Sequence, residues 1–188
     1  MFARIFALMS LSSALLTGCV SLSTPTLDQS WQGRFSISAQ SPTARENHSG
    51  RFTLSHSGQS LTVLDLKSPL GNTLARITQT PKVVSLDALG SSTVEASDAE
   101  ALLLKTLGFS VPVQGLQYWL DGNPIPNQEA QTAPSTRPYR QIKQNGWIIQ
   151  YENYDEAGLP KRIRLERGAS ETAPAISILL LISARNAS

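Results

Sequence analysis

Cysteine and histidine, which often serve as nucleophiles, bases and metal ligands, are rare in this sequence. There is one cysteine, Cys19, and the two histidines, His48 and His56, lie in or beside a polar stretch. No Gly-x-Ser-x-Gly sequence, metal-spaced cluster or phosphate-binding loop accompanies them. The carboxylates within residues 152–156 gather near a turn, where such groups are ordinary surface residues. We therefore expect no enzyme and no metal site, and we expect both histidines to be solvated.

The single cysteine follows a segment with the features of a secretory leader. Arg4 supplies the positive charge, and an apolar stretch from Ile5 to Leu16 precedes small residues. This stretch is shorter than the roughly 20 residues that a membrane-spanning helix needs. We therefore interpret residues 1–18 as a signal peptide. One cysteine also excludes an internal disulfide bond.

Residues 16–19, with the sequence Leu-Thr-Gly-Cys, resemble the lipobox of bacterial lipoproteins. In such lipoproteins the cysteine carries a diacylglyceryl group and a further acyl chain such as palmitate. The resemblance implies a lipid anchor at Cys19, with residues 19–30 forming the lipidated cysteine and a flexible tether. Val20 and Ser21 follow the cysteine where an aspartate would imply the inner membrane, so the resemblance implies the outer one. The alternative is an ordinary leader whose cysteine is incidental.

Composition indicates one globular domain over residues 31–188. The chain has 188 residues, of which 40% are hydrophobic and 16% charged, which suits a single core. A balance of 16 Lys and Arg to 14 Asp and Glu lacks the basic excess typical of nucleic-acid binding. Basic residues within 161–167 alternate with Ile163 and Leu165, which indicates the solvated face of a strand. A phosphate-facing role for these residues is the alternative.

Alternating apolar and polar residues predict an antiparallel sheet. Strands are expected at residues 31–39, 51–56, 61–67, 73–79, 82–87, 93–95, 139–144, 147–153, 162–167 and 176–182. Residues 40–47 and the proline-rich residues 121–138 are interpreted as loops, and Asn145-Gly146 predicts a hairpin. The continuous apolar run Ile176–Ile182 is interpreted as a last strand buried on both faces.

Helical patterns appear only in the middle of the chain. Ser97 and Glu100 have the spacing of a capping box, an apolar stripe follows, and Gly108 can end the helix. A second helical segment is expected over residues 112–120. About ten strands tend to curl, and two helices with apolar stripes need a surface to cover. The sequence therefore predicts a curved or partly closed barrel whose mouth the helices cover.

The turn at residues 68–71, Ser-Pro-Leu-Gly, has the residue types that a type I turn favours. Its geometry places Leu70 at the apex, where a leucine would expose apolar surface. One interpretation is that Leu70 folds back onto its own sheet, and single exposed leucines are also common. The turn alone leaves a functional role for Leu70 open.

The lipobox, this turn and the stretch VPVQGLQYWLDG from Val111 to Gly122 together resemble the LolB family of outer-membrane lipoprotein receptors. The resemblance covers most of the mature chain. It implies a mainly β protein with α, an unclosed antiparallel β-barrel of about ten strands covered by a helical lid, without nucleotide, metal or other cofactor. Such receptors accept lipoproteins from a soluble LolA-like periplasmic carrier and insert them into the outer membrane. The family's loop leucine matches Leu70, which implies a membrane insertion loop at Pro69, Leu70 and Gly71.

The resemblance implies a hydrophobic cavity for the acyl chains of the cargo lipoprotein. The expected lining residues are Phe35, Ile37, Phe52, Leu54, Leu64, Leu66, Leu102, Leu103 and Trp119. We expect a lipid-anchored monomer on the periplasmic face of the outer membrane, without a nucleic-acid partner. The alternative is an outer-membrane lipoprotein that serves as an assembly or scaffold module and has no acyl-binding cavity. The run Ile176–Ile182 departs from the alternating last strand that is usual in the family.

Overall fold

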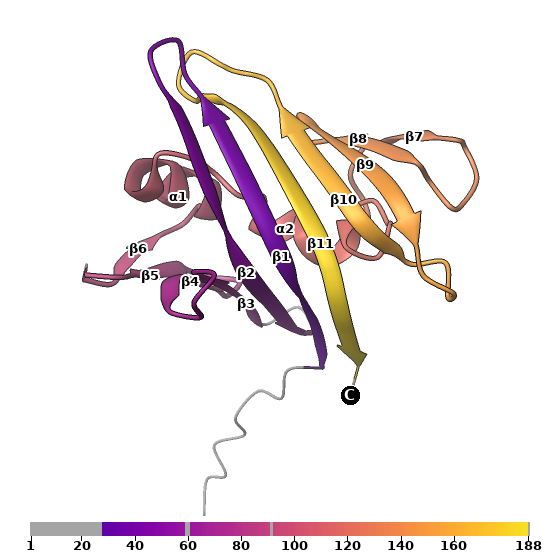
Figure 1. Ribbon diagram of the computed structural model, residues 1–188, viewed down its shortest axis with the longest axis horizontal. Helices are drawn as coiled ribbons and strands as arrows, with labels where there is room; N and C mark the ends of the chain where they lie inside the picture. The colour runs from indigo at the N-terminus through magenta and orange to yellow at the C-terminus, as the bar shows by residue number, and fades with distance from the viewer. Residues whose placement is uncertain (1–27, 59–60, 91, 188) are drawn as a thin grey trace, which may run out of the picture.

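One open antiparallel sheet and two helices make up the fold in the computed structural model (Figure 1). The structure describes residues 28–58, 61–90 and 92–187. In chain order the elements are β1 (Gln29–Gln40), β2 (Arg45–Ser57), β3 (Leu61–Lys67), β4 (Thr73–Gln79), β5 (Val84–Ala88), β6 (Val94–Ala96), α1 (Ala99–Leu107), α2 (Val113–Trp119), β7 (Gln131–Ala133), β8 (Gln141–Gln144), β9 (Trp147–Tyr154), β10 (Pro160–Arg167) and β11 (Ala175–Ala187). The strand order is β6-β5-β4-β3-β2-β1-β11-β10-β9-β8-β7, so β6 and β7 are the two edges.

The first and last strands pair with each other in the middle of the sheet. Gln29 of β1 lies opposite Ala187 of β11 and, on its other side, opposite His56 of β2. Figure 1 shows β1 and β11 side by side. The turn at residues 68–72 follows Lys67, which lies at the far end of the β2–β3 hairpin from this point. The start of β1 and the 68–72 turn are therefore at opposite ends of the strands.

A glycine marks the place where β1 is bent. The register between β1 and β11 shifts between Gln32 and Gly33, which is a β-bulge. A Cβ atom at Gly33 would lie 2.2 Å from the carbonyl oxygen of Leu181 and 2.8 Å from the ring of Phe52. Only a residue without a side chain allows the neighbouring strand to approach so closely.

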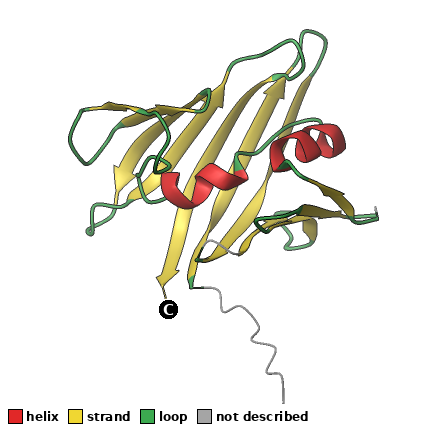
Figure 2. Ribbon diagram, turned by 180° about the vertical axis from the view of Figure 1, so that it is seen from behind, coloured by secondary structure: helices red, strands yellow, loops and turns green. Residues whose placement is uncertain are grey.

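Each long strand has one buried and one exposed face. Along β1 the exposed and buried residues alternate, as the sequence predicts. Both helices lie on one face of the sheet, as Figure 2 shows, and we call this the inner face and the opposite one the outer face. The expected architecture, an unclosed antiparallel β-barrel covered by a helical lid, is confirmed. Within the described residues, neither helix is long and apolar enough to span a membrane.

The prediction that the last strand is buried on both faces is wrong. Ile176, Ile178, Leu180 and Ile182 of β11 are buried, whereas Leu179 is half-buried and Leu181 is 36% exposed. The helices cover only the inner face, so alternate leucines of this run face outward. The strand is also longer than predicted, because polar residues at its end still pair with β1.

Three further predictions of local structure are wrong. Asp98 caps α1, with its Oδ1 accepting from the N–H of Ala101 at 2.7 Å, so the Ser97–Glu100 capping box does not form. Residues 45–47 belong to β2 rather than to a loop, and β7 lies within the predicted loop 121–138. Residues 45–49 are exposed throughout, so no apolar alternation marks this part of the hairpin.

Candidate functional site

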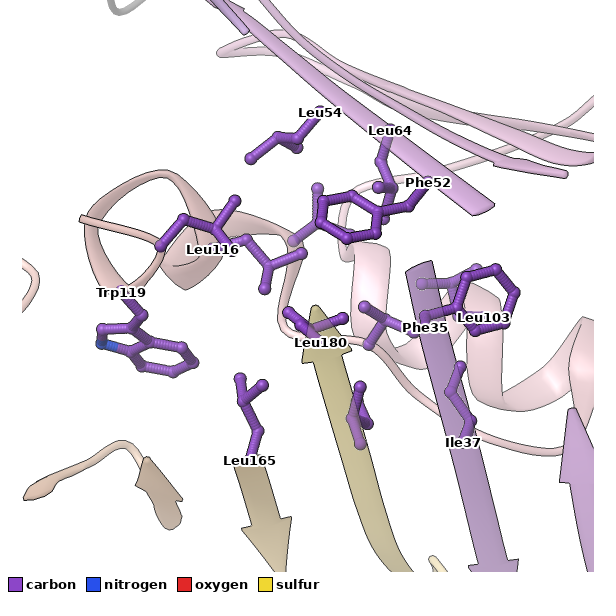
Figure 3. Packing of buried hydrophobic residues seen from close by; sticks show 14 of the residues in the cluster. Phe35, Ile37, Phe52, Leu54, Leu64, Leu103, Leu116, Trp119, Leu165 and Leu180 are labelled. Atoms are coloured by element: carbon purple, nitrogen blue, oxygen red, sulfur yellow. The ribbon is translucent and has the colours of Figure 1, made fainter. Parts of the chain in front are cut away.

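The apolar residues that were expected to line a cavity come together between the inner face of the sheet and the two helices. Each is 0–6% exposed and belongs to one buried cluster. They are Phe35, Ile37, Phe52, Leu54, Leu64, Leu66, Leu102, Leu103 and Trp119. Figure 3 shows that the labelled side chains from the strands and from the two helices point toward a common interior.

Strand register explains why these side chains meet. Phe52 lies opposite Leu66, and Leu54 lies opposite Leu64, so β2 and β3 turn the same pairs inward. Directly opposite residues in an antiparallel pair have neighbouring side chains on one face. Phe35 of β1 meets Leu180 of β11 in the same way. The sequence-based list omits the inward residues of β9, β10 and β11, although the alternation over Ile163 and Leu165 could have identified two of them.

A buried glutamine attaches the end of α2 to the sheet. Gln144 of β8 accepts hydrogen bonds at its Oε1 from the Nε1 of Trp119 at 3.0 Å and from the N–H of Ile125 at 2.8 Å. Its Nε2 donates to the carbonyl of Ile125 at 3.0 Å. Because buried polar groups are costly unless they are paired, this network fixes Trp119 in one position. Sequence reasoning missed Gln144, which looks like any polar strand residue.

Arg185 of β11 holds the turn after α2 from the other side. Its Nη2 donates to the carbonyl of Leu120 at 3.0 Å, and its Nε lies 3.4 Å from Oδ1 of Asp121. The same carboxylate oxygen accepts from the Nε1 of Trp31 at 2.7 Å. The end of α2 is therefore bound to both β1 and β11.

Arg167 of β10 binds α1 and the segment that links the helices. Its Nη1 donates to Oε2 of Glu100 at 2.5 Å, and its Nη2 donates to the hydroxyl of Ser110. Its guanidinium carbon lies 4.6 Å from the ring centre of Trp147, a cation–π contact. Gln144, Arg185 and Arg167 thus attach the helices to the sheet by polar contacts at separate points.

Two buried aromatic side chains of β9 each carry a polar atom that has no hydrogen-bond partner among the described residues. These atoms are the hydroxyl of Tyr151 and the Nε1 of Trp147. Burial raises the pKa of the Tyr151 hydroxyl well above its ordinary value, and the nearby Tyr154 and Asp121 add to this effect. The hydroxyl therefore stays protonated as a potential donor inside an apolar environment.

Buried side chains from the strands and from both helices pack together in one cluster, with small cavities beside it. A cavity of about 100 Å³ lies beside Val113, Gly115 and Trp119, and one of about 260 Å³ opens next to Gln117 and Tyr118. A site for a drug-sized ligand usually has roughly 300–1,000 Å³. The larger hollows of about 610 Å³ and 440 Å³ lie on the outer face and around β7 and β8. Neither of the two cavities beside the helices reaches the volume usual for a drug-sized ligand.

The 68–72 turn presents its leucine to solvent. The N–H of Gly71 donates to the carbonyl of Ser68 at 2.9 Å, and Gly71 has a φ of +95°, which favours glycine. Leu70 is 92% exposed, so it does not fold back onto the sheet. Leu89, which sequence reasoning missed, is 75% exposed on the next turn along the same end of the sheet, and its N–H donates to Leu74 at 3.0 Å.

The candidate chemical residues form no catalytic arrangement. His48 is exposed, but His56 is half-buried, so the prediction that both are solvated is wrong for His56. Its Nδ1 lies 3.0 Å from Oγ1 of Thr62, and burial lowers the pKa of His56. Within the described residues, no group of three or more His, Cys, Asp or Glu side chains could hold a metal ion. The predicted signal peptide and Cys19 lie outside the described residues.

The fold and the buried inner face define a protein class, the unclosed β-barrels with a helical lid over an apolar interior. The family described as "Outer membrane lipoprotein LolB" matches residues 28–184. This match covers more than half of the chain, so the chain belongs to the LolB family.

Individual relatives agree with this assignment. The chain is similar to the outer-membrane lipoprotein LolB of Cupriavidus metallidurans, at 31% identity over 97% of both chains. It is 35% identical to that of Thiobacillus denitrificans over 89% of this chain and 92% of the relative. A solved structure of a LolA superfamily protein from Nitrosomonas europaea aligns with a TM-score of 0.47 and 12% identity, over 86% of this chain and 87% of that one.

Family membership makes the chain an outer-membrane lipoprotein receptor of the lipoprotein-localisation pathway, and not an enzyme. The expectations for family, function class and outer-membrane location are therefore confirmed. A receptor of this pathway interacts with lipoprotein cargo and its carrier in general.

Proposed function

We propose that this receptor binds the acyl chains of a cargo lipoprotein against its inner face and passes them to the outer membrane at the Leu70 turn. The inner face offers one contiguous apolar surface from Phe35 on β1 to Leu103 on α1 and Trp119 on α2. Burial of each acyl methylene contributes about 0.8 kcal/mol, so a surface of this extent can hold acyl chains. One or both helices must move outward before an acyl chain can enter, because their side chains occupy the space next to the inner face.

The partner that delivers the cargo is a LolA-like periplasmic carrier, and the receptor acts as a monomer. Transfer runs in one direction if the inner face binds acyl chains more tightly than the carrier does and less tightly than the bilayer does. No nucleotide or metal is needed, since the free-energy difference between these three environments drives each step.

Membrane contact is made by Pro69, Leu70 and Gly71. The turn is closed by its own hydrogen bonds, so Leu70 is held outward in a defined place. Leu89 on the neighbouring turn enlarges the apolar surface at the same end of the sheet. Such a tip can enter the boundary between headgroups and acyl chains and lower the barrier to release of the cargo.

The lipid anchor belongs to the same proposal. Residues 1–18 are removed as a signal peptide, Cys19 is acylated, residues 19–30 form the tether, and residues 31–188 form the lipoprotein-binding domain. Attachment through several acyl chains is effectively stable, whereas a single chain would exchange.

The exposure of Leu70 carries this proposal, and a transfer assay tests it. Carrier loaded with a lipoprotein is mixed with the receptor and then with vesicles. Leu70→Glu should accept cargo as the wild type does, but delivery to vesicles should stall. Ala157→Glu adds the same charge to the exposed β9–β10 turn and is the matched control, which should deliver normally. Unimpaired delivery by Leu70→Glu would remove the role of the turn.

A further inference from the structure

Three cations lie side by side on the outer face of the sheet. Arg34 of β1 is directly opposite Arg51 of β2, and Arg51 is directly opposite Lys67 of β3. Directly opposite residues have Cβ atoms about 4.5–5.5 Å apart on the same face, and like charges in such positions are destabilising. We call these residues the cationic row. Its cost in stability suggests that the row has a purpose other than holding the fold together.

The cationic row has no compensating acid among the described residues. Arg34, Arg51 and Lys67 are exposed or half-buried, and none of them makes an ion pair or a side-chain hydrogen bond there. Asp65 precedes Lys67 by two residues on the same face. Both of its oxygens are already bound by Arg76, at 2.6 Å and 2.9 Å.

Another outer-face cation shows the more usual arrangement. Arg162 of β10 binds Glu152 of β9 at 2.8 Å, and these two residues are direct cross-strand partners. A cation on the outer face can therefore form an ion pair with an acid directly opposite it on the next strand. The positive charge of the cationic row is available to an external anion.

A hollow next to the turn gives an anion a place to sit. It has a volume of about 210 Å³, and its lining includes Arg34, Ser49, Arg51 and Pro69. A phosphate group there would meet two guanidinium groups, which favour phosphate oxygens, and the hydroxyl of Ser49. The hollow joins the cationic row to the turn that carries Leu70.

The distance between the cationic row and Leu70 matches the depth of the headgroup region of a lipid bilayer. Lys67 precedes Leu70 by three residues, so the two are within roughly 10 Å of each other along the chain. The headgroup region of a bilayer is several ångströms deep on each side, because the hydrocarbon core is about 30 Å thick and the whole bilayer about 40–45 Å. When Leu70 lies at the acyl boundary, the cationic row lies at the depth of the lipid phosphates.

We propose that the cationic row binds the phosphate groups of anionic phospholipids while Leu70 contacts the acyl region. This inference rests on the proposed membrane contact of the Leu70 turn and adds its lipid specificity and its orientation. Two contacts at different depths fix the tilt of the domain on the membrane, whereas one leucine alone would let the domain rotate.

Vesicle co-sedimentation tests the proposal. The chain from residue 19 onward, with Cys19→Ser to prevent acylation, is mixed with vesicles of phosphatidylcholine alone or of phosphatidylcholine with phosphatidylglycerol. The wild-type row should bind the anionic vesicles more tightly, and added salt should reduce the difference. Each cation near an anionic surface strengthens binding about fivefold. Removing all three should therefore weaken binding to anionic vesicles on the order of 100-fold.

Variants separate the cationic row from net charge and from folding. The test variant is Arg34→Gln/Arg51→Gln/Lys67→Gln. The matched control removes the same charge at exposed positions elsewhere, with Lys82→Gln/Lys105→Gln/Lys143→Gln, and should lose far less. Arg34→Lys/Arg51→Lys keeps the charge and should retain most of the binding. A thermal melt of the test variant should be no lower than that of the wild type, because like-charge repulsion is relieved.

The outcomes distinguish this inference from the proposed function. Leu70→Glu should weaken binding to both kinds of vesicle, whereas the test variant should lose only the preference for anionic ones. Equal binding of the test variant and the charge-matched control would overturn the role of the cationic row and leave that of Leu70 intact. Loss of cargo acceptance from the carrier without loss of vesicle binding would instead assign the row to a protein partner, and would also overturn the proposal.

Discussion

Arg167 of β10 and Glu100 of α1 form an ion pair, with 2.5 Å between Nη1 and Oε2, that holds the first helix over the inner face. Arg167 also binds Ser110 and lies over the ring of Trp147, so its guanidinium is fixed by three neighbours. The second helix has different attachments, through Gln144 and Arg185. The polar contacts that hold the two helices are therefore made by different residues of the sheet.

Removing the charge at Glu100 should loosen α1. Glu100→Gln weakens a half-exposed pair, so we expect a loss of about 1 kcal/mol in unfolding free energy. For a chain of this size the Tm should fall by roughly 2–4 °C. Amide hydrogen exchange in α1 should speed up, and an apolar dye should bind more strongly. The control is Glu95→Gln, because Glu95 is exposed, and unchanged exchange in α1 would show that the ion pair does not hold the helix.

Gln144→Leu should be strongly destabilising. The substitution leaves the Nε1 of Trp119 and the N–H of Ile125 without their acceptor, and each buried orphan group costs about 1–3 kcal/mol. We expect a loss of roughly 2–4 kcal/mol by denaturant unfolding, with a changed environment of the Trp119 indole in near-UV spectra. Gln141→Leu on the other face of the same strand should have little effect. A small loss for Gln144→Leu would mean that α2 is held by apolar contacts alone.

Gly33→Ala should disturb the bend in β1. The new Cβ would lie 2.2 Å from the carbonyl oxygen of Leu181, so β1 and β11 would have to separate. Such overpacking costs typically about 1–3 kcal/mol. Gly168→Ala is the control, since a Cβ there meets no atom within 4 Å. Thermal unfolding of both variants checks this, and equal stability would show that the bulge can relax.

Tyr151→Phe should raise stability because it removes a buried hydroxyl without a partner. The gain should be about 1 kcal/mol near neutral pH. Burial raises the pKa of Tyr151, so the unfolded chain loses the proton before the folded one as pH rises above about 10. The stability of the wild type should thus fall in that alkaline range, and that of the variant should fall less. If cargo esters use the hydroxyl as a donor, the variant should also bind cargo more weakly.

The strands were predicted well from the sequence where one face is buried and the other is exposed. The alternation over residues 31–39 and the Asn145-Gly146 turn are local signals, and the structure agrees with both. Patterns failed where burial depends on distant partners. Leu181 looks buried within its apolar run, but no helix covers the outer face at β11, so it is exposed.

The inner-face residues could be predicted more completely than the polar contacts that hold the helices. Apolar side chains on one strand face must share an interior, so Phe35 and Leu64 could be placed without knowledge of the partners. Arg167 and Glu100 are 67 residues apart, and nothing in the sequence around either one indicates the other. The cationic row could not be predicted from the sequence either, because only the register of three strands brings its residues side by side.

The first strand begins at Gln29, at the end of the strands far from Leu70. The residues from Cys19 to Asp28 span at most roughly 33–36 Å when fully extended, and β3 is itself about 23 Å long. If Cys19 carries the proposed acyl group and residues 19–30 form the proposed tether, Leu70 stays within a few nanometres of one leaflet. For a short flexible linker, the effective concentration of the Leu70 turn at the lipid surface is then in the millimolar range. A contact between the Leu70 turn and lipid that is too weak to recruit a soluble protein to the membrane is then sufficient for a domain that is already anchored there.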